Sequence, residues 1–277
     1  MRLLAHLSDL HFGRLDPVVL RGLREELARA QPHVLVVSGD LTQRARIPEF
    51  QQARHFLDSL PGPQVVVPGN HDLSPLYSVA RWRTPLARYM RYVTPDLQPF
   101  YGDEEMAIIG INTARATTVK GGRISRLQVL RACERLGGAP PDALRIIVTH
   151  HPFDLPLSGG GAVVGRASMA MAGFARCGVD LFLSGHLHVS HTGATATRYQ
   201  ISGYCALIVE AGTAVSSRVR GEFNSWNLLR VEPGRVEVQR FTWSGGRFDV
   251  AARESYRRGS AGWQPAAASE APARSGG

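Results

Sequence analysis

The chain has 277 residues, 44% of them hydrophobic, which is enough to bury one large α/β core or two modest ones. Its formal net charge of +9 would suit a polyanion, but the basic residues are scattered rather than gathered into a stripe with aromatic residues. A nucleic-acid partner is therefore an alternative that we do not favour. No stretch approaches the roughly 20 apolar residues of a membrane helix, and the N-terminus does not resemble a signal peptide, so we expect no membrane association.

The N-terminal part of the chain alternates between predicted strands and helices, which favours a parallel sheet. Hydrophobic residues recur at helical spacing from Asp16 to Gln31, with Asp16 as the N-cap and Pro17 in the first helical position. Pro48 opens a second predicted helix, and a third is predicted from Ser125 to Leu136.

Residues 73–105 are interrupted by prolines and carry several aromatic side chains. We expect a helical insertion over the functional site that could help select substrate. The alternative, which we favour for the aromatic residues, is that they serve only in packing. A glycine-rich loop at Gly159-Gly160-Gly161 is expected to be mobile and near the site.

The C-terminal part of the chain has a different character, because its predicted strands are no longer separated by helices. These strands are Tyr199–Val209, Trp226–Val231 and Arg235–Trp243, and they predict a second, partly antiparallel sheet stacked on the first. Residues 257–277 are rich in Ala, Gly, Ser and Pro and predict a disordered tail, which leaves 1–256 as a single domain.

The chain contains three cysteines, and we expect all of them to be free thiols in a reducing cytoplasm. The odd number and the placement of these residues among predicted helices and strands favour this interpretation. They are Cys133, Cys177 and Cys205.

The main functional pattern is that five short hydrophobic runs each end in Asp, Asn or His. These groups are Asp9-Leu10-His11, Gly39-Asp40, Gly69-Asn70-His71-Asp72, His150-His151 and Gly185-His186-Leu187-His188. One such group would be ordinary turn chemistry, but turn chemistry does not account for all of them in succession. Ligands bind at the carboxyl ends of strands in open α/β sheets, and imidazole with carboxylate suits Mn, Fe, Zn or Co. The sequence therefore predicts a transition-metal site.

In this order, the five groups resemble those of the calcineurin-like metallophosphoesterases. The likeness is greatest to the bacterial group of class III cyclic nucleotide phosphodiesterases and glycerophosphodiesterases, and it runs from Leu4 to about Val231. The resemblance implies an α/β fold, a four-layer αββα sandwich of two mixed β-sheets flanked by helices. It also allows a homodimer.

The resemblance further implies the metal ligands. Asp9, His11 and His188 would bind the first ion. Asn70, His150 and His186 would bind the second. Asp40 would join the two, because a carboxylate has two oxygens that can each face an ion. His151 is expected to point away and to have a structural role.

Other residues would act on the substrate. The resemblance implies that His71 stabilises the phosphate and protonates the leaving alkoxide. Asp72 would orient His71, with a helix N-cap as an equal alternative. Asn70, Asn112 and Arg115 are further expected substrate contacts.

The implied activity is hydrolysis of a small phosphoester, most simply a phosphodiester such as a cyclic nucleotide or glycerophosphodiester, by in-line attack of a metal-bound hydroxide. The alternatives of the same fold are a phosphomonoesterase, a lipid-diphosphate hydrolase and a DNA-end nuclease. A non-enzymatic scaffold is not favoured, because no expected ligand is missing from the sequence.

Overall fold

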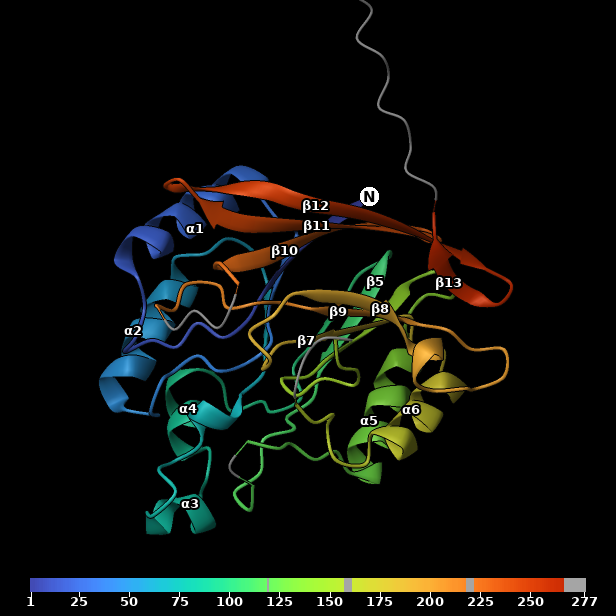
Figure 1. Cartoon of the computed structure of the whole chain (residues 1–277). Coiled ribbons are helices and arrows are strands. Elements are labelled where there is room, and N and C mark those ends of the chain that lie inside the picture. The colour runs from blue at the N-terminus through green and yellow to red at the C-terminus, as the bar shows by residue number, and fades with distance from the viewer. Residues whose placement is uncertain (119, 157–160, 218–221, 267–277) are drawn as a thin grey trace, which may run out of the picture.

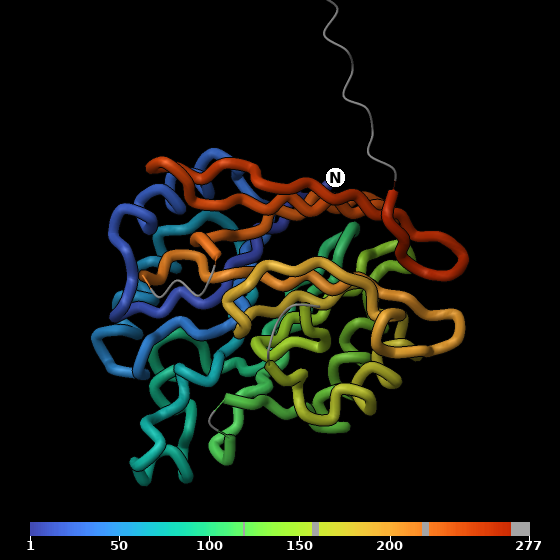
Figure 2. The backbone as a smooth tube through the Cα atoms, in the orientation of Figure 1, coloured from blue at the N-terminus to red at the C-terminus, as the bar shows by residue number. Residues whose placement is uncertain are grey.

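The computed structural model describes residues 1–118, 120–156, 161–217 and 222–266. Two mixed β-sheets stack face to face, and helices cover the outer face of each (Figures 1 and 2). This arrangement is the predicted four-layer αββα sandwich, which the structure confirms.

The first sheet joins the beginning of the chain to its end. Its strands β1, β2 and β3 are parallel, and β10 pairs antiparallel with β1 and continues into a meander at the opposite edge. In spatial order the strands are β13 (Gly262–Pro265), β12 (Arg247–Gly259), β11 (Arg235–Ser244), β10 (Ser225–Glu232), β1 (Arg2–Leu7), β2 (Val34–Val37) and β3 (Gln64–Val66).

The second sheet is built from the middle of the chain. Its four inner strands are parallel, and an antiparallel strand closes each edge. In spatial order the strands are β4 (Phe100–Gly102), β5 (Met106–Gly110), β6 (Leu144–Val148), β7 (Leu181–Ser184), β9 (Leu207–Glu210) and β8 (His191–Ala194).

Helices flank both sheets (Figure 1). The first sheet is covered by α1 (Pro17–Ala30) and α2 (Ile47–Asp58), and the second by α5 (Arg126–Gly137) and α6 (Ala167–Arg176). The predicted N-cap of α1 is confirmed, since the Asp16 carboxylate accepts the Val18 N–H at 2.8 Å.

The expected insertion forms two short helices, α3 (Val79–Arg83) and α4 (Ala87–Tyr92), which lead into β4. Its aromatic residues do not share one role, because Tyr89 is fully buried whereas Trp82 is 62% exposed. In Figure 1, α3 lies at the far end of an arm that extends away from the sheets.

The central strands are buried on both faces, and alternate residues enter different cores. Leu4 and Val36 of the first sheet and Ile146 of the second belong to the core between the sheets. Leu35 packs in the core under α1 and α2, and Ile147 in the core under α5 and α6.

Three details of the predicted strands are wrong. The C-terminal strands β10–β13 extend the first sheet rather than forming a second one, because β10 pairs with β1. The strand predicted over Tyr199–Val209 forms only at Leu207–Glu210. The predicted tail begins too early, because β12 runs to Gly259 and β13 to Pro265, while residues 267–277 lie outside the described residues.

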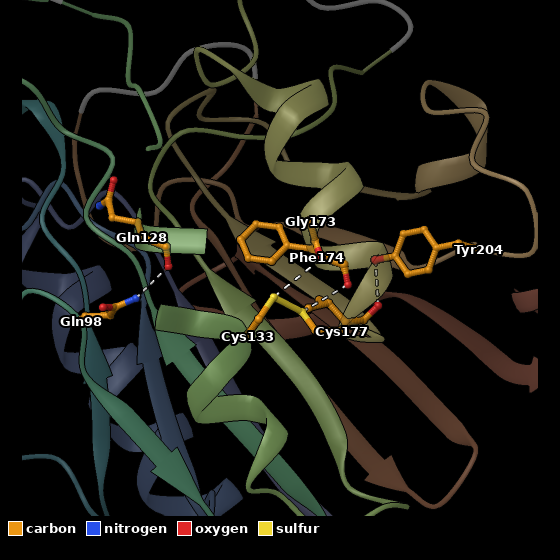
Figure 3. The surroundings of a disulfide bond; sticks show 8 residues. Gln98, Gln128, Cys133, Gly173, Phe174, Cys177 and Tyr204 are labelled. Atoms are coloured by element: carbon orange, nitrogen blue, oxygen red, sulfur yellow. Dashed lines mark hydrogen bonds between the residues drawn. A yellow bond between two sulfur atoms is a disulfide. The ribbon is translucent and has the colours of Figure 1, made fainter. Parts of the chain in front are cut away.

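The cysteines also depart from expectation. A disulfide bond joins Cys133 of α5 to Cys177, directly after α6 (Figure 3), so the prediction of free thiols is correct only for Cys205. The packing of α5 beside α6 brings the two Cα atoms to within 5.6 Å of each other, which is in the range that a disulfide requires.

None of the helices in the described part of the chain is long and apolar enough to cross a bilayer.

Candidate metal centre

The predicted ligands meet where the parallel strands of both sheets end. β1, β2 and β3 deliver one part of the set, and β6 and β7 deliver the rest. Several of these residues adopt left-handed backbone conformations, which cost L-residues roughly 1–2 kcal/mol each and persist only where the surroundings enforce them. They are Asp9 (φ 51°), His11 (φ 49°), Asp40 (φ 51°), His186 (φ 75°) and His188 (φ 61°).

The first group of side chains contains Asp9, His11 and His188. Asp9 Oδ1 lies 3.6 Å from His11 Nε2 and 3.4 Å from His188 Nε2, and the two nitrogens are 3.5 Å apart. All three side chains are buried, and their ligand atoms are close enough together to hold one ion.

The second group contains Asn70, His150 and His186. His150 Nε2 lies 3.2 Å from both Asn70 Oδ1 and His186 Nδ1. His150 Nδ1 donates to the carbonyl of Ser38 at 2.8 Å, so the Nε2 lone pair of the neutral ring faces the group.

Asp40 lies between the two groups. Its Oδ1 is 3.4 Å from His150 Nε2, and its Oδ2 is 3.9 Å from His11 Nε2. The His71 backbone N–H donates to Oδ1 at 2.9 Å and helps to fix the carboxylate. Each oxygen of one carboxylate therefore faces a different group, which is the arrangement expected of a bridging residue.

Polar contacts outside the groups hold the ligands in place. Asp9 Oδ2 accepts hydrogen bonds from Ser8 Oγ at 2.7 Å and from the His186 N–H at 2.9 Å. His188 Nδ1 lies 2.7 Å from Thr213 Oγ1. These contacts leave Asp9 Oδ1 buried without a hydrogen-bond partner among the described residues, directed at the two histidines of its group.

The carboxylates of the centre favour positive charge beside them, whereas burial and the charge of His150 lower the pKa of His186 to about 4. Burial opposes ionisation of Asp9, but the charge of His188 and a contact with His11 outweigh it and lower the pKa of the carboxyl. Burial also lowers the pKa of His150, but the Asp40 and Asp9 carboxylates and the Ser38 carbonyl reverse the effect and raise it to about 9.

These residues fit transition-metal ions. Buried carboxylate oxygens and imidazole nitrogens converge without enough hydrogen-bond donors between them, and a cation would satisfy them. The donor set is nitrogen and oxygen with no thiolate, as Mn, Fe, Zn or Co would accept.

His71 has its own orienting partner. Its Nδ1 lies 2.8 Å from the carbonyl oxygen of Gln43, so Nδ1 carries a proton and Nε2 is the atom left for other contacts. The half-buried ring stands 4.9 Å from the His11 ring, measured between centroids, and lines the cavity above the centre.

The contacts of Asp72 do not support the expectation that it orients His71, and they agree in part with the capping alternative, because its carboxylate accepts the N–H of Gly69, the N-cap of the short helix Asn70–Asp72. The buried Asp72 carboxylate accepts hydrogen bonds from the backbone N–H groups of Leu41, Thr42 and Gly69 and from the Thr42 hydroxyl. It thus ties the loop after β2 to the loop after β3, which carry Asp40 and Asn70.

The expected structural role of His151 agrees with its contacts. Its Nδ1 lies 2.8 Å from Thr113 Oγ1 and its Nε2 lies 3.1 Å from the Lys120 carbonyl, so both ring nitrogens are occupied. Its nitrogens lie near those of His150 and His186. However, the Lys120 carbonyl requires a proton on Nε2, and the Thr113 hydroxyl occupies the lone pair on Nδ1, so neither nitrogen is left to bind an ion.

Asn112 and Arg115 are not brought to the centre. Arg115 donates to the carbonyls of Asn112 and Ala114 and to Gln128, and Asn112 Oδ1 accepts the Ala114 N–H. Both residues line a separate cavity beside α4. Their expected contact with substrate is not supported, because local hydrogen bonds occupy them.

A cavity of about 720 Å³ opens over the centre and is lined by Asp40, Asn70, His71, His186 and His188. Gly161 of the glycine-rich loop also lines it, while Gly159 and Gly160 lie outside the described residues. The cavity has a basic rim that we did not predict, formed by Arg44, Arg46, Arg88 and Lys120. In the sequence, the feature that comes nearest to indicating this rim is the pair Arg44 and Arg46, shortly after Asp40.

Comparisons with known proteins agree with this geometry. The sequence model of the calcineurin-like phosphoesterases matches residues 3–190. The curated glycerophosphodiester phosphodiesterase GpdQ of Enterobacter lignolyticus (strain SCF1) is 41% identical over 86 residues, which cover 25% of this chain and 29% of that protein.

Solved structures resemble the fold more broadly. Purple acid phosphatase PPD1 from yellow lupin (Lupinus luteus) aligns with a TM-score of 0.69 at 11% identity, over 92% of this chain and 53% of its own. A dimetal phosphatase from Danio rerio aligns with a TM-score of 0.62 at 12% identity, over 86% of this chain and 95% of its own. At these identities the likeness shows the fold, and the chain spans about half of the lupin protein.

Proposed function

The chain belongs to the calcineurin-like phosphoesterase family, and from that premise we propose that it is a metal-dependent phosphodiesterase that acts on small molecules. The observation that carries the proposal is the position of Asp40, whose two oxygens face two separate groups of nitrogen and oxygen ligands. Two bound transition-metal ions would supply Lewis acidity toward the phosphate oxygens and toward the attacking water.

The ligand assignments are part of this proposal. Asp9, His11 and His188 would hold one ion, and Asn70, His150 and His186 the other, with Asp40 between them. His150 Nδ1 donates to the Ser38 carbonyl, and His188 Nδ1 lies within hydrogen-bond distance of Thr213 Oγ1. These contacts orient the two rings, which sets the direction of their Nε2 lone pairs before any ion arrives.

His71 would act on the substrate itself. The Gln43 carbonyl holds its Nδ1 proton, so a second proton on Nε2 would face the cavity. From there it could stabilise charge on the phosphate and pass to the departing alkoxide oxygen. Asp72 would be a positioning residue, because it fixes the loops of Asp40 and Asn70 rather than touching substrate.

The preference for a diester is supported by the partial match to a glycerophosphodiesterase. A monoesterase, a lipid-diphosphate hydrolase and a DNA-end nuclease are the competing outcomes. A cytoplasmic location and a homodimer stay predictions, and the disulfide between Cys133 and Cys177 removes the free-thiol argument for a reducing compartment.

The test is reconstitution with Mn, Fe, Zn or Co, followed by measurement of metal content and of rates on bis-p-nitrophenyl phosphate and p-nitrophenyl phosphate. We expect two ions per chain and a higher kcat/KM on the diester. A higher kcat/KM on the monoester would refute the diesterase, and no turnover of either ester by metal-loaded protein would refute hydrolysis.

The role of His71 is tested by His71→Ala, with His55→Ala on the exposed face of α2 as the matched control. We expect His71→Ala to keep both ions and to lose about 10²–10⁴-fold in kcat, the usual contribution of a proton donor. Unchanged turnover in His71→Ala would refute its role, and an equal loss in His55→Ala would show that the effect is not specific to the site.

A further inference from the structure

The cavity over the centre is strongly basic. Its lining includes the side chains of Arg44, Arg46, Arg81, Arg88 and Lys120, whereas Asp40 is the only acidic residue among the described residues that line it. Because Asp40 is assigned to the metals, no carboxylate of the lining is left to balance these cations.

Arg81 differs from the others, because its charge is already used within the fold. It is 4% exposed and donates to the carbonyls of Ser74, Ala116 and Thr118. These bonds fasten α3 to the loop that leads to Lys120. The cations left for a ligand are therefore those of the basic rim, Arg44, Arg46, Arg88 and Lys120.

The segment that carries Arg44 and Arg46 has a fixed and strained conformation. Ala45 between them has φ 52°, in the left-handed region that alanine rarely adopts. The buried Glu49 carboxylate accepts the N–H groups of Arg44 at 2.8 Å and Arg46 at 3.2 Å, and Thr42 Oγ1 accepts that of Ala45. Several hydrogen bonds thus hold the backbone of Arg44 and Arg46, on either side of Ala45, at the rim of the cavity.

Arg88 reaches the same segment from α4. Its Nη1 donates to the Ala45 carbonyl at 2.7 Å, which places its guanidinium beside the residue that separates Arg44 from Arg46. Among the described residues, no carboxylate lies within 4.0 Å of the charged nitrogens of the basic rim. Other arginines do have such partners, for example Arg54 with Asp58 at 2.6 Å.

Grouped like charges without a counter-ion repel one another, and an anion would relieve that repulsion. We propose that the substrate carries a second phosphate beyond the ester that is cleaved, and that Arg44, Arg46 and Arg88, with Lys120, bind this phosphate. This inference rests on the proposed phosphodiesterase. The cavity of about 720 Å³ is of the size that holds a small molecule, so the second phosphate belongs to a small bisphosphate rather than to a polynucleotide.

The apolar part of the cavity fits the rest of such a molecule. Leu73, Pro75 and Leu76 of the insertion and Leu187 between the two ligand histidines line it. An uncharged ring or chain between the two phosphates would lie against these side chains, while the arginines would form charge-assisted, bidentate bonds with the outer phosphate.

The experiment uses two esters that differ only in the second phosphate. These are thymidine 3′-(p-nitrophenyl phosphate) and its 5′-phosphorylated form, assayed with the metal-loaded protein. We expect the 5′-phosphate to raise kcat/KM by about tenfold or more, mainly through KM, and the gain to shrink at high salt. Arg44→Gln combined with Arg46→Gln should bring the ratio between the two esters close to one.

The control is Arg131→Gln, which removes the same charge from the exposed face of α5 and should leave the ratio of the two esters unchanged. A second readout does not need turnover. Calorimetric titration should show thymidine 3′,5′-bisphosphate binding about tenfold more tightly than thymidine 3′-phosphate, and the double variant should lose this difference.

The outcomes separate the two proposals. No turnover of either ester, with the binding difference intact, would overturn the hydrolase and support the phosphate site. Equal binding of the two nucleotides, or a preference that survives in the double variant, would overturn the phosphate site and leave the hydrolase standing. A short oligothymidylate that binds more than tenfold tighter than the bisphosphate would overturn the small-molecule assignment.

Discussion

Glu210 gives the sharpest prediction about stability. It is the last residue of β9, it is fully buried, and neither of its carboxyl oxygens has a hydrogen-bond partner among the described residues. Burial, followed by the nearby charge of Asp154, raises its pKa from 4.5 to about 9. At neutral pH this carboxyl is therefore protonated in the folded protein and ionised in the unfolded chain.

The direction of the pH effect follows from this difference. Between the two pKa values the unfolded chain holds fewer protons at this position, so each pH unit of increase lowers the free energy of unfolding by about 1.4 kcal/mol. The effect is absent below the unfolded pKa and becomes constant above the folded one. At pH 7 the position costs the fold about 3 kcal/mol, taken over the interval from 4.5 to 7.

Glu210→Gln removes the titration and nearly preserves the volume of the side chain. In urea unfolding followed by tryptophan fluorescence, the free energy of unfolding of the variant relative to that of the wild type should rise by about 3 kcal/mol from about pH 5.5 to about pH 7.5. All other titrating groups are common to both proteins and cancel in this comparison. Any fixed cost of the amide cancels as well, because only the change with pH is used.

Glu25→Gln, at an exposed position of α1, is the matched control and should show no such change. A difference between Glu210→Gln and the wild type that stays constant across this pH range would refute the reasoning. It would mean that the carboxyl finds a partner or is hydrated in the folded protein.

Two further predictions concern the centre. Added Mn²⁺ at about 100 times its Kd should raise the free energy of unfolding of the wild type by about 2.7 kcal/mol in thermal or urea unfolding. Asp40→Asn should lose most of this gain because one bridging charge is missing. An equal gain in both proteins would contradict the bridging position of Asp40. In Gly69→Ala the new methyl group would collide with the backbone and carboxylate of Asp40. We therefore expect the free energy of unfolding to fall by about 1–3 kcal/mol and metal binding to be impaired. The control Gly137→Ala, at a site on α5 with open space around it, should be neutral or slightly stabilising. Equal stability of the two alanine variants would contradict the tight packing at Gly69.

The convergence of the candidate ligands could be predicted from the sequence because each part of the pattern is local. A buried strand followed by a polar group, as in Val34–Val37 and then Asp40, shows where a strand ends and what chemistry its end carries. Parallel strands then bring such ends to one edge by geometry alone. The structure accordingly groups Asp9 with His188 and Asn70 with His150, although these residues are far apart in the chain.

Features that depend on distant pairing could not be predicted in this way. The partner of β10 is β1, and nothing within Ser225–Glu232 specifies this choice. The disulfide depends on how α5 packs against α6, which the spacing of Cys133 and Cys177 does not reveal. The local partners of Arg115 could not be predicted either, because its bond to Gln128 lies across a loop, and a sequence shows that a guanidinium is present but not what it binds.

The division of the ligands between two sheets has a consequence for fragments of this protein. The first sheet supplies the candidate ligands Asp9, His11, Asp40 and Asn70, and the second supplies His150, His186 and His188. A cut in the chain anywhere between β3 and β6 would give pieces that each carry an incomplete set of donors. Under the proposed function, neither piece would hydrolyse an ester alone and turnover would return only when the two pieces reassemble, so recovery of turnover would serve as a direct measure of complementation.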